Sequence, residues 1–139
     1  MPKLLLIVSL LFCAQLVQAQ EAQSVPPRIG VKIPLGDHIF MEDYRIGFEK
    51  VIEDSRCPTG VDCVWEGRAV VGLSIVAPDG STEQKEVIIK PTVVKADQLP
   101  VLISGENWAI RVLALQPYPE EPAIPMEYKL VVSGNERGQ

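Results

Sequence analysis

The sequence predicts an all-β fold: a single antiparallel β-sandwich with an immunoglobulin-like layout, or a small barrel. One observation is that short runs of alternating apolar and polar residues recur along the chain, at the period of a β-strand. A second is that 12 prolines and 10 glycines separate these runs, and both residue types interrupt regular structure. A third is that no segment keeps a helical period, and segment 95–102 is expected to form one turn at most. These features predict about six or seven short strands.

Two segments near the start of the domain show the alternation. Segment 28–35, RIGVKIPL, places its isoleucines, valine and leucine at every second position. Segment 44–52, YRIGFEKVI, begins in the same way and loses the alternation at Lys50-Val51. A β-bulge at that point would return the apolar side chains to the core face.

The longest alternating segment, 63–76, predicts one continuous strand. Its odd positions are apolar or small and begin with Cys63, Trp65 and Gly67, whereas its even positions are mixed. One face of this strand is therefore expected to cover the core. Further strands are expected over 86–91, 108–115 and 127–132, and the proline-rich segment 116–125 separates the last two.

The first 19 residues have the features of a cleaved export signal. Lys3 gives a positive start, residues 4–14 are apolar, and Val17-Gln18-Ala19 offers small residues to a signal peptidase. The apolar run is shorter than the roughly 20 residues that a membrane-spanning helix needs. Lipid attachment at Cys13 is the alternative, although Phe12 stands where lipoprotein signals have a small residue. We therefore expect a periplasmic or secreted protein.

The chain is expected to divide into a signal peptide (1–19), a flexible lead (20–27), a β-sandwich domain (28–133) and a flexible tail (134–139). Loss of Lys3 with the signal changes the net charge from −5 to −6. No basic run is present and aromatic residues make up 6%, so nucleic acid and membrane surfaces are poor candidates for a partner. We expect a monomer whose partner, if any, is another exported protein.

The two cysteines that remain after signal removal are expected to form a disulfide. A redox-active pair has two residues between its cysteines at the start of a helix, and Cys57 and Cys63 have five. A zinc site needs about four ligands and a copper site needs two histidines beside its cysteine, but His38 is the only histidine. Residues 57–60 suit a type I turn that would return the chain toward Cys63, and Trp65 is expected to pack against the bridge.

The stretch around these cysteines resembles a motif shared by small exported bacterial β-proteins of uncharacterised function. Asp54, Arg56, Cys57 and Pro58, in DSRCP, carry the resemblance together with the later residues of the pattern, which are Cys63, Trp65 and Gly67. Members of this group also have a late Pro-Tyr-Pro segment, here residues 117–119. The resemblance implies an exported β-fold and implies no activity.

A catalytic function is not expected. A nucleophilic serine or cysteine needs a base beside it, and the single histidine lies in no such pattern. The acidic pairs 42–43, 53–54 and 120–121 are typical of solvated loops, although a glycosidase also uses two carboxylates. The sequence indicates no cofactor and no metal site, with one alternative considered below.

Three functions remain open at this point. The preferred one is a non-catalytic exported domain with a binding or protective role. The first alternative is an inhibitor of an exported hydrolase that acts through residues 54–63, with Arg56 as the exposed recognition residue. In the competing interpretation, Arg56 bonds loop carbonyls and Asp54 caps the turn. The second alternative is a periplasmic metal-handling protein around His38.

Overall fold

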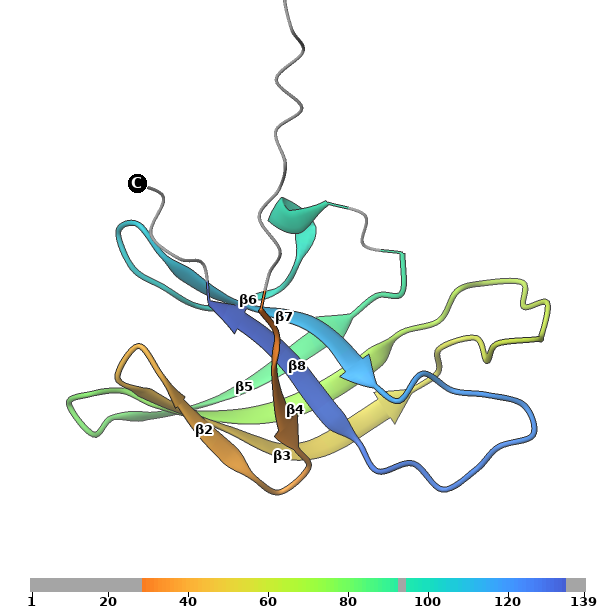
Figure 1. Cartoon of the computed structure of the whole chain (residues 1–139), viewed down its shortest axis with the longest axis horizontal. Helices are drawn as coiled ribbons and strands as arrows, with labels where there is room; N and C mark the ends of the chain where they lie inside the picture. The colour runs from red at the N-terminus through yellow and green to blue at the C-terminus, as the bar shows by residue number, and fades with distance from the viewer. Residues whose placement is uncertain (1–28, 93–94, 135–139) are drawn as a thin grey trace, which may run out of the picture.

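The computed structural model describes residues 29–92 and 95–134, and these form a sandwich of two antiparallel four-stranded sheets (Figure 1). The expected signal peptide, lead and tail lie almost wholly outside the described residues. The strands are β1 (Val31–Pro34), β2 (His38–Met41), β3 (Tyr44–Asp54), β4 (Ala69–Val76), β5 (Thr82–Ile89), β6 (Val101–Ser104), β7 (Ala109–Gln116) and β8 (Lys129–Gly134). The prediction of an all-β sandwich is confirmed, and the sheets do not close into a barrel.

The order of the strands is β1-β8-β7-β6 in one sheet, here called sheet A, and β2-β3-β4-β5 in the other, sheet B. In sheet B, consecutive strands are therefore neighbours, which is a simple meander. In sheet A, β6, β7 and β8 form a meander, and β1 pairs with the outer edge of β8. This order differs from the immunoglobulin arrangement, in which the first sheet runs A-B-E-D.

The predicted bulge in segment 44–52 is confirmed. The register between β3 and β4 shifts between Phe48 and Lys50, and again between Val51 and Glu53. These shifts return Val51 to the partly buried apolar residues that pack on the core. The core itself lies between the sheets, and Phe48 is its largest fully buried side chain.

Two strands and one helical turn complete the fold. The strands β2 and β6 were not among the predicted strand segments, because their sequences, HIFM and VLIS, do not alternate between apolar and polar residues. The single turn expected in segment 95–102 is present as a 3-10 turn, η1 (Ala96–Gln98). None of the helical segments in the described part of the chain has the length and apolar character needed to span a bilayer.

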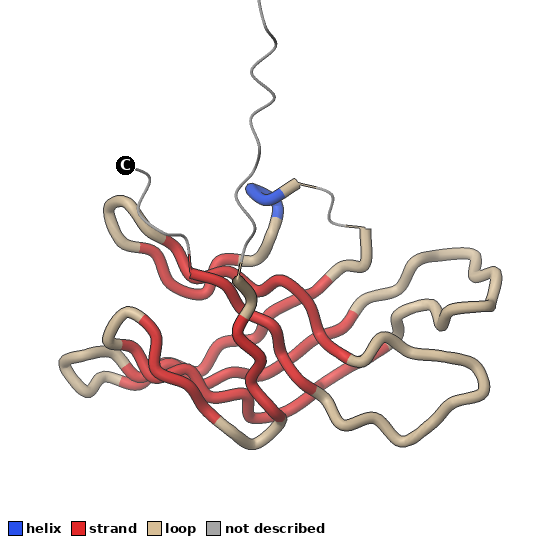
Figure 2. The backbone as a smooth tube through the Cα atoms, viewed as in Figure 1, coloured by secondary structure: helices blue, strands red, loops and turns tan. Residues whose placement is uncertain are grey.

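The predicted strand over 63–76 begins later than expected. Strand β4 starts at Ala69, and residues 63–68 belong to the long loop that follows β3. This loop, between β3 and β4, and the loop between β7 and β8 leave the same end of the sandwich (Figure 2). The expected site residues at 54–67 therefore lie at one end of the molecule.

Candidate functional site

The candidate functional site is the end of the sandwich at which two long loops lie side by side (Figure 1, right). Residues 55–68, here called the disulfide loop, join β3 to β4, and residues 117–128, the proline loop, join β7 to β8. The backbone nitrogen of Thr59 donates a hydrogen bond to the Pro119 carbonyl at 3.0 Å. Thr59 and Glu120 also form an isolated parallel bridge, so the loops support each other.

The base of the disulfide loop continues the pairing of β3 with β4. The Ser55 nitrogen donates to the Arg68 carbonyl at 2.8 Å, and the Cys57 nitrogen donates to the Glu66 carbonyl at 3.0 Å. Gly67, between these two acceptors, has a φ of 69°, which is a left-handed conformation that favours glycine. A Cβ atom on Gly67 would lie 1.8 Å from the Ser55 carbonyl oxygen. Only glycine fits this close approach of the two backbones.

The predicted disulfide between Cys57 and Cys63 is present, with an S–S distance of 2.01 Å and a Cα–Cα distance of 5.9 Å. The turn inside it lies one residue later than predicted. The Val61 nitrogen donates to the Pro58 carbonyl at 3.3 Å, and Gly60, the third residue of this turn, has a φ of 83°. A positive φ at the third position is the requirement of a type II turn, so Gly60 decides the turn type.

Arg56 anchors the disulfide loop to sheet A. Its side chain is buried, and its Nε and Nη2 atoms each donate to an oxygen of Asp54 at 2.7 Å. Nη1 donates to the Leu115 carbonyl at 2.7 Å, and Nη2 also donates to the Pro117 carbonyl at 3.1 Å. The guanidinium lies 5.0 Å from the centre of the Tyr118 ring, within the range of a cation–π contact.

These contacts contradict the alternative in which Arg56 is an exposed recognition residue. Arg56 is 5% exposed and its donors bond to carbonyls and a carboxylate within the chain, as the structural interpretation predicted. The expected role of Asp54 as a cap is also supported, because its Oδ1 atom accepts from the Arg56 nitrogen at 3.4 Å.

Asp54 is held as a carboxylate. Burial raises the pKa of Asp54, but hydrogen bonds and charge from Arg56, with a further hydrogen bond from Tyr128, lower it more, and the pKa lies below its ordinary value. The Tyr128 hydroxyl donates to Oδ2 at 3.0 Å, and burial and this bond raise the pKa of Tyr128. Since the carboxylate already accepts from Arg56 and Tyr128, its role is to hold the two loops in position.

The prediction that Trp65 packs against the disulfide is wrong. Trp65 is 78% exposed. The alternation that assigned Trp65 to the core face breaks at Gly67, whose positive φ changes the direction of the chain. The covered face begins only at Ala69. The glycine was the available signal, because an isolated glycine in a strand pattern often marks a bulge or a close backbone approach.

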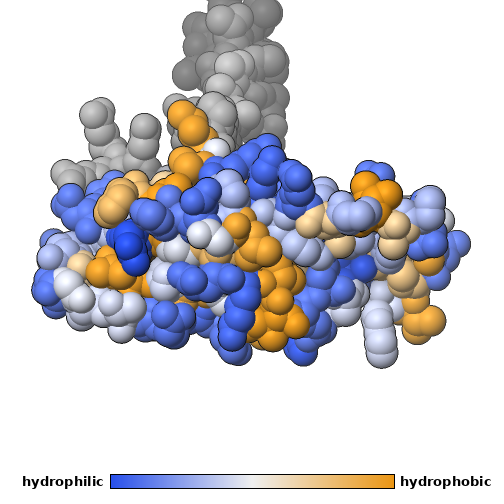
Figure 3. Space-filling view, turned by 90° about the horizontal axis from the view of Figure 1, so that it is seen from below, coloured by the Kyte–Doolittle hydropathy of each residue, from blue (hydrophilic) through white to orange (hydrophobic). Residues whose placement is uncertain are grey.

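The disulfide loop carries an exposed apolar surface that was not predicted from the sequence. Val64 is 103% exposed, Val61 is also exposed, and both lie within five residues of Trp65. We call Val61, Val64 and Trp65 the apolar tip. On the proline loop, Ile124 is also exposed. Figure 3 shows apolar residues on the surface at this end of the molecule.

Because Trp65 is exposed, its loss is expected to cost less stability than loss of the disulfide. Trp65→Ala is expected to change the free energy of unfolding by less than about 0.5 kcal/mol, the range of ordinary surface changes. Replacing Cys57 and Cys63 with serine is expected to cost about 2–2.5 kcal/mol, because the closed loop restricts the unfolded chain. Urea unfolding of both variants tests the order. Trp108→Ala is the matched control, since Trp108 is partly buried against the core and its loss should cost clearly more than the loss of Trp65.

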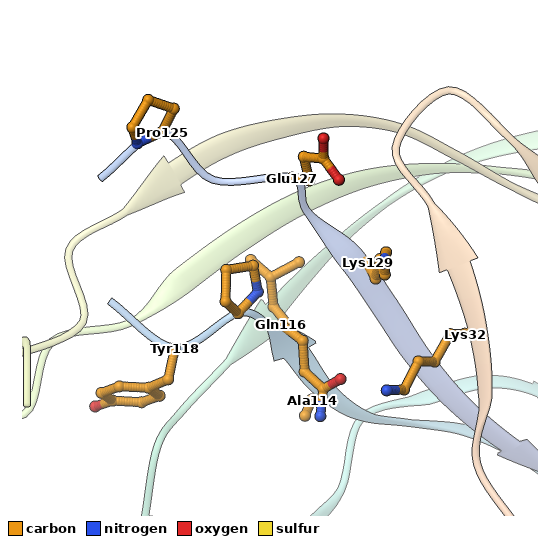
Figure 4. A pocket seen from close by; sticks show the side chains of 9 residues that line it. Lys32, Ala114, Gln116, Tyr118, Pro125, Glu127 and Lys129 are labelled. Atoms are coloured by element: carbon orange, nitrogen blue, oxygen red, sulfur yellow. The ribbon is translucent and has the colours of Figure 1, made fainter. Parts of the chain in front are cut away.

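A groove of about 730 Å³ lies beside the proline loop on the outer face of sheet A (Figure 4). Tyr118, Pro125 and Glu127 line it from the loop, and Lys32 and Lys129 line it from β1 and β8. In Figure 4 the amine of Lys32 points across the groove toward Ala114 and Gln116 on β7. The groove therefore holds lysines, whereas the two loops hold none.

His38 is the first residue of β2 and is exposed. Its ring meets the ring of Phe40 edge to face, with centres 5.7 Å apart. Within residues 29–92 and 95–134, no three histidine, cysteine, aspartate or glutamate residues come together as a potential metal site. The metal-handling alternative therefore stays a prediction that rests on His38 alone.

Comparison of the chain with protein-family models, with curated proteins and with solved structures finds no match. The resemblance to small exported bacterial proteins with a DSRCP motif therefore stays a prediction.

Proposed function

We propose that this protein is a non-catalytic exported domain that binds another protein through the apolar tip. The single observation that carries the proposal is the exposure of Val61, Val64 and Trp65, which lie inside and directly after the ring that the disulfide closes. Exposed apolar side chains that are grouped in one loop mark a candidate interaction site. Tryptophan is also among the residues that contribute most to binding when a partner buries them.

The anchoring of the loop supports the same proposal. The disulfide, the buried Arg56 and the backbone bonds to Arg68 and Glu66 hold the loop in place. A loop that is ordered before binding loses less conformational entropy when the partner docks. These contacts therefore raise the affinity that three apolar side chains can provide.

The shape of the loop also supports the narrower function of a hydrolase inhibitor. The disulfide loop extends beyond the ends of β3 and β4 (Figure 1), and a projecting loop can enter a cleft. In that function Trp65 and Val64 would occupy the cleft, and Arg56 would support the loop from behind. The inhibitor alternative therefore no longer depends on Arg56 as the contact residue.

The test is to cross-link the protein to its partners in the cell envelope, with and without the apolar tip. Val64→Ser/Trp65→Ser is the tip variant. Phe40→Ser/Ile88→Ser is the matched control, because both of those residues are exposed apolar residues of sheet B. Partners are identified by mass spectrometry and the purified pair is titrated.

The tip variant is expected to bind the identified partner at least about tenfold more weakly, and the control variant is expected to bind like the original protein. Both variants should keep the original free energy of unfolding. Equal affinity of the tip variant and the original protein for the same partner would show that the apolar tip is not the binding surface.

A further inference from the structure

We infer, on the basis of this proposed function, that the partner is a protein whose apolar pocket is bordered by lysine and arginine side chains. The two loops beside the apolar tip carry mostly negative charge, and their only two arginines, Arg56 and Arg68, lie at the base of the disulfide loop. Segments 57–67 and 116–128 contain no lysine or arginine. They contain five carboxylates, all on exposed residues: Asp62, Glu66, Glu120, Glu121 and Glu127.

The arginines at the base of the disulfide loop do not offset this charge. Arg56 is paired with Asp54, and Arg68 lies 3.1 Å from Glu53. Each arginine is thus balanced by a carboxylate of β3. Within the described residues, neither arginine is therefore paired with an acidic residue of segments 57–67 or 116–128.

The five exposed carboxylates do not form a potential metal site. In the described part of the chain they do not approach one another closely enough to form a group of three potential ligands. They also do not lie in the groove with Lys32 and Lys129, except for Glu127. The charge of the other four is therefore available to a molecule that covers the apolar tip.

Charge complementarity then selects the class of partner. When a partner buries the tip, the surrounding carboxylates face its surface, and opposing charges on that surface speed the encounter and favour the correct register. An anionic bilayer would also accept tryptophan and valine, but membrane-binding surfaces of this kind use lysine and arginine to attract anionic lipid. The negative charge of the two loops disfavours an anionic membrane and favours a basic protein surface.

The test uses defined probes. Two fluorescent amphipathic peptides of equal length are titrated, one built from leucine and lysine and the other from leucine and glutamate, together with vesicles of phosphatidylcholine and phosphatidylglycerol. Asp62→Asn/Glu120→Gln/Glu121→Gln removes charge beside the tip. Glu83→Gln/Glu86→Gln/Glu106→Gln is the matched control, because it removes the same charge from exposed residues outside both loops.

We expect the leucine–lysine peptide to bind and the leucine–glutamate peptide and the vesicles not to bind. The loop variant should weaken binding about tenfold and reduce its dependence on salt, whereas the control variant should stay within about twofold. If the loop and control variants behave alike, or if the vesicles bind, the inferred partner class is wrong.

The tip variant Val64→Ser/Trp65→Ser separates this inference from the proposed function. If it abolishes binding while the loop charges have no effect, the binding surface is correct and only the partner class is overturned. If it leaves the binding of every probe unchanged, the apolar tip is not the contact surface, and the inference fails with the proposed function.

Discussion

Replacing Arg56 with methionine is expected to destabilise the protein by about 3–5 kcal/mol, because it leaves a carboxylate without its partner in a covered position. Asp54 loses both guanidinium bonds, and the carbonyls of Leu115 and Pro117 lose their donor. Methionine keeps much of the apolar length of the side chain, so the effect reports the polar contacts. Urea unfolding monitored by circular dichroism measures it.

Arg68→Met is the matched control for Arg56→Met. Arg68 also pairs with a carboxylate of β3, Glu53, but the side chains of this pair are 51% and 39% exposed, against 3% and 7% for Arg56 and Asp54. Water screens the exposed pair, so Arg68→Met should change the free energy of unfolding far less. Equal effects of the two substitutions would show that the contacts of Arg56 do not hold the loop.

The pH dependence of the Arg56→Met effect provides a second check. In the original protein the pKa of Asp54 is lowered, so its contribution to stability is present at neutral pH and is lost as the pH falls below about 4. Without Arg56, burial raises the pKa of Asp54, and the carboxyl group takes up a proton more readily. The destabilisation should therefore be largest near pH 7 and should shrink at about pH 3. A destabilisation that grows at low pH would contradict this assignment.

The regular part of the fold could be predicted from local patterns. Segment 44–52 contains both the alternation and its interruption at Lys50, and the structure places a bulge there. The disulfide could also be predicted, since no other use of Cys57 and Cys63 had the residues it needs. These features depend on residues that are close in the sequence.

The anchoring of the disulfide loop could not be predicted in the same way. Arg56 bonds to the carbonyl of Leu115, which is 59 residues away. Every residue has a backbone carbonyl, so the residue type at position 115 does not indicate that this carbonyl accepts a hydrogen bond. The orientation of Trp65 depends on the backbone conformation of Gly67, which periodicity does not describe. The exposed tip therefore became visible only in three dimensions.

Gly67→Ala is expected to destabilise the protein by about 3 kcal/mol or more, from two causes that act together. The first is the φ of 69°, which a residue with a Cβ atom adopts only at a cost. The second is the position that this Cβ atom would take, 1.8 Å from the Ser55 carbonyl oxygen and 3.0 Å from the Cα atom of Arg56. Because these are backbone atoms, the strands must separate at the base of the loop.

Gly60→Ala separates the two causes within the same loop. Gly60 has a φ of 83°, and a Cβ atom there would meet nothing within 4 Å, so its cost should be that of the conformation alone, about 1–2 kcal/mol. Separation of the strands in Gly67→Ala should also disturb Arg56 and thereby the loop that carries the apolar tip. Binding through the tip should therefore weaken in Gly67→Ala and persist in Gly60→Ala. Equal costs for the two alanines, with binding retained in both, would mean that Gly67 does not lie against Ser55.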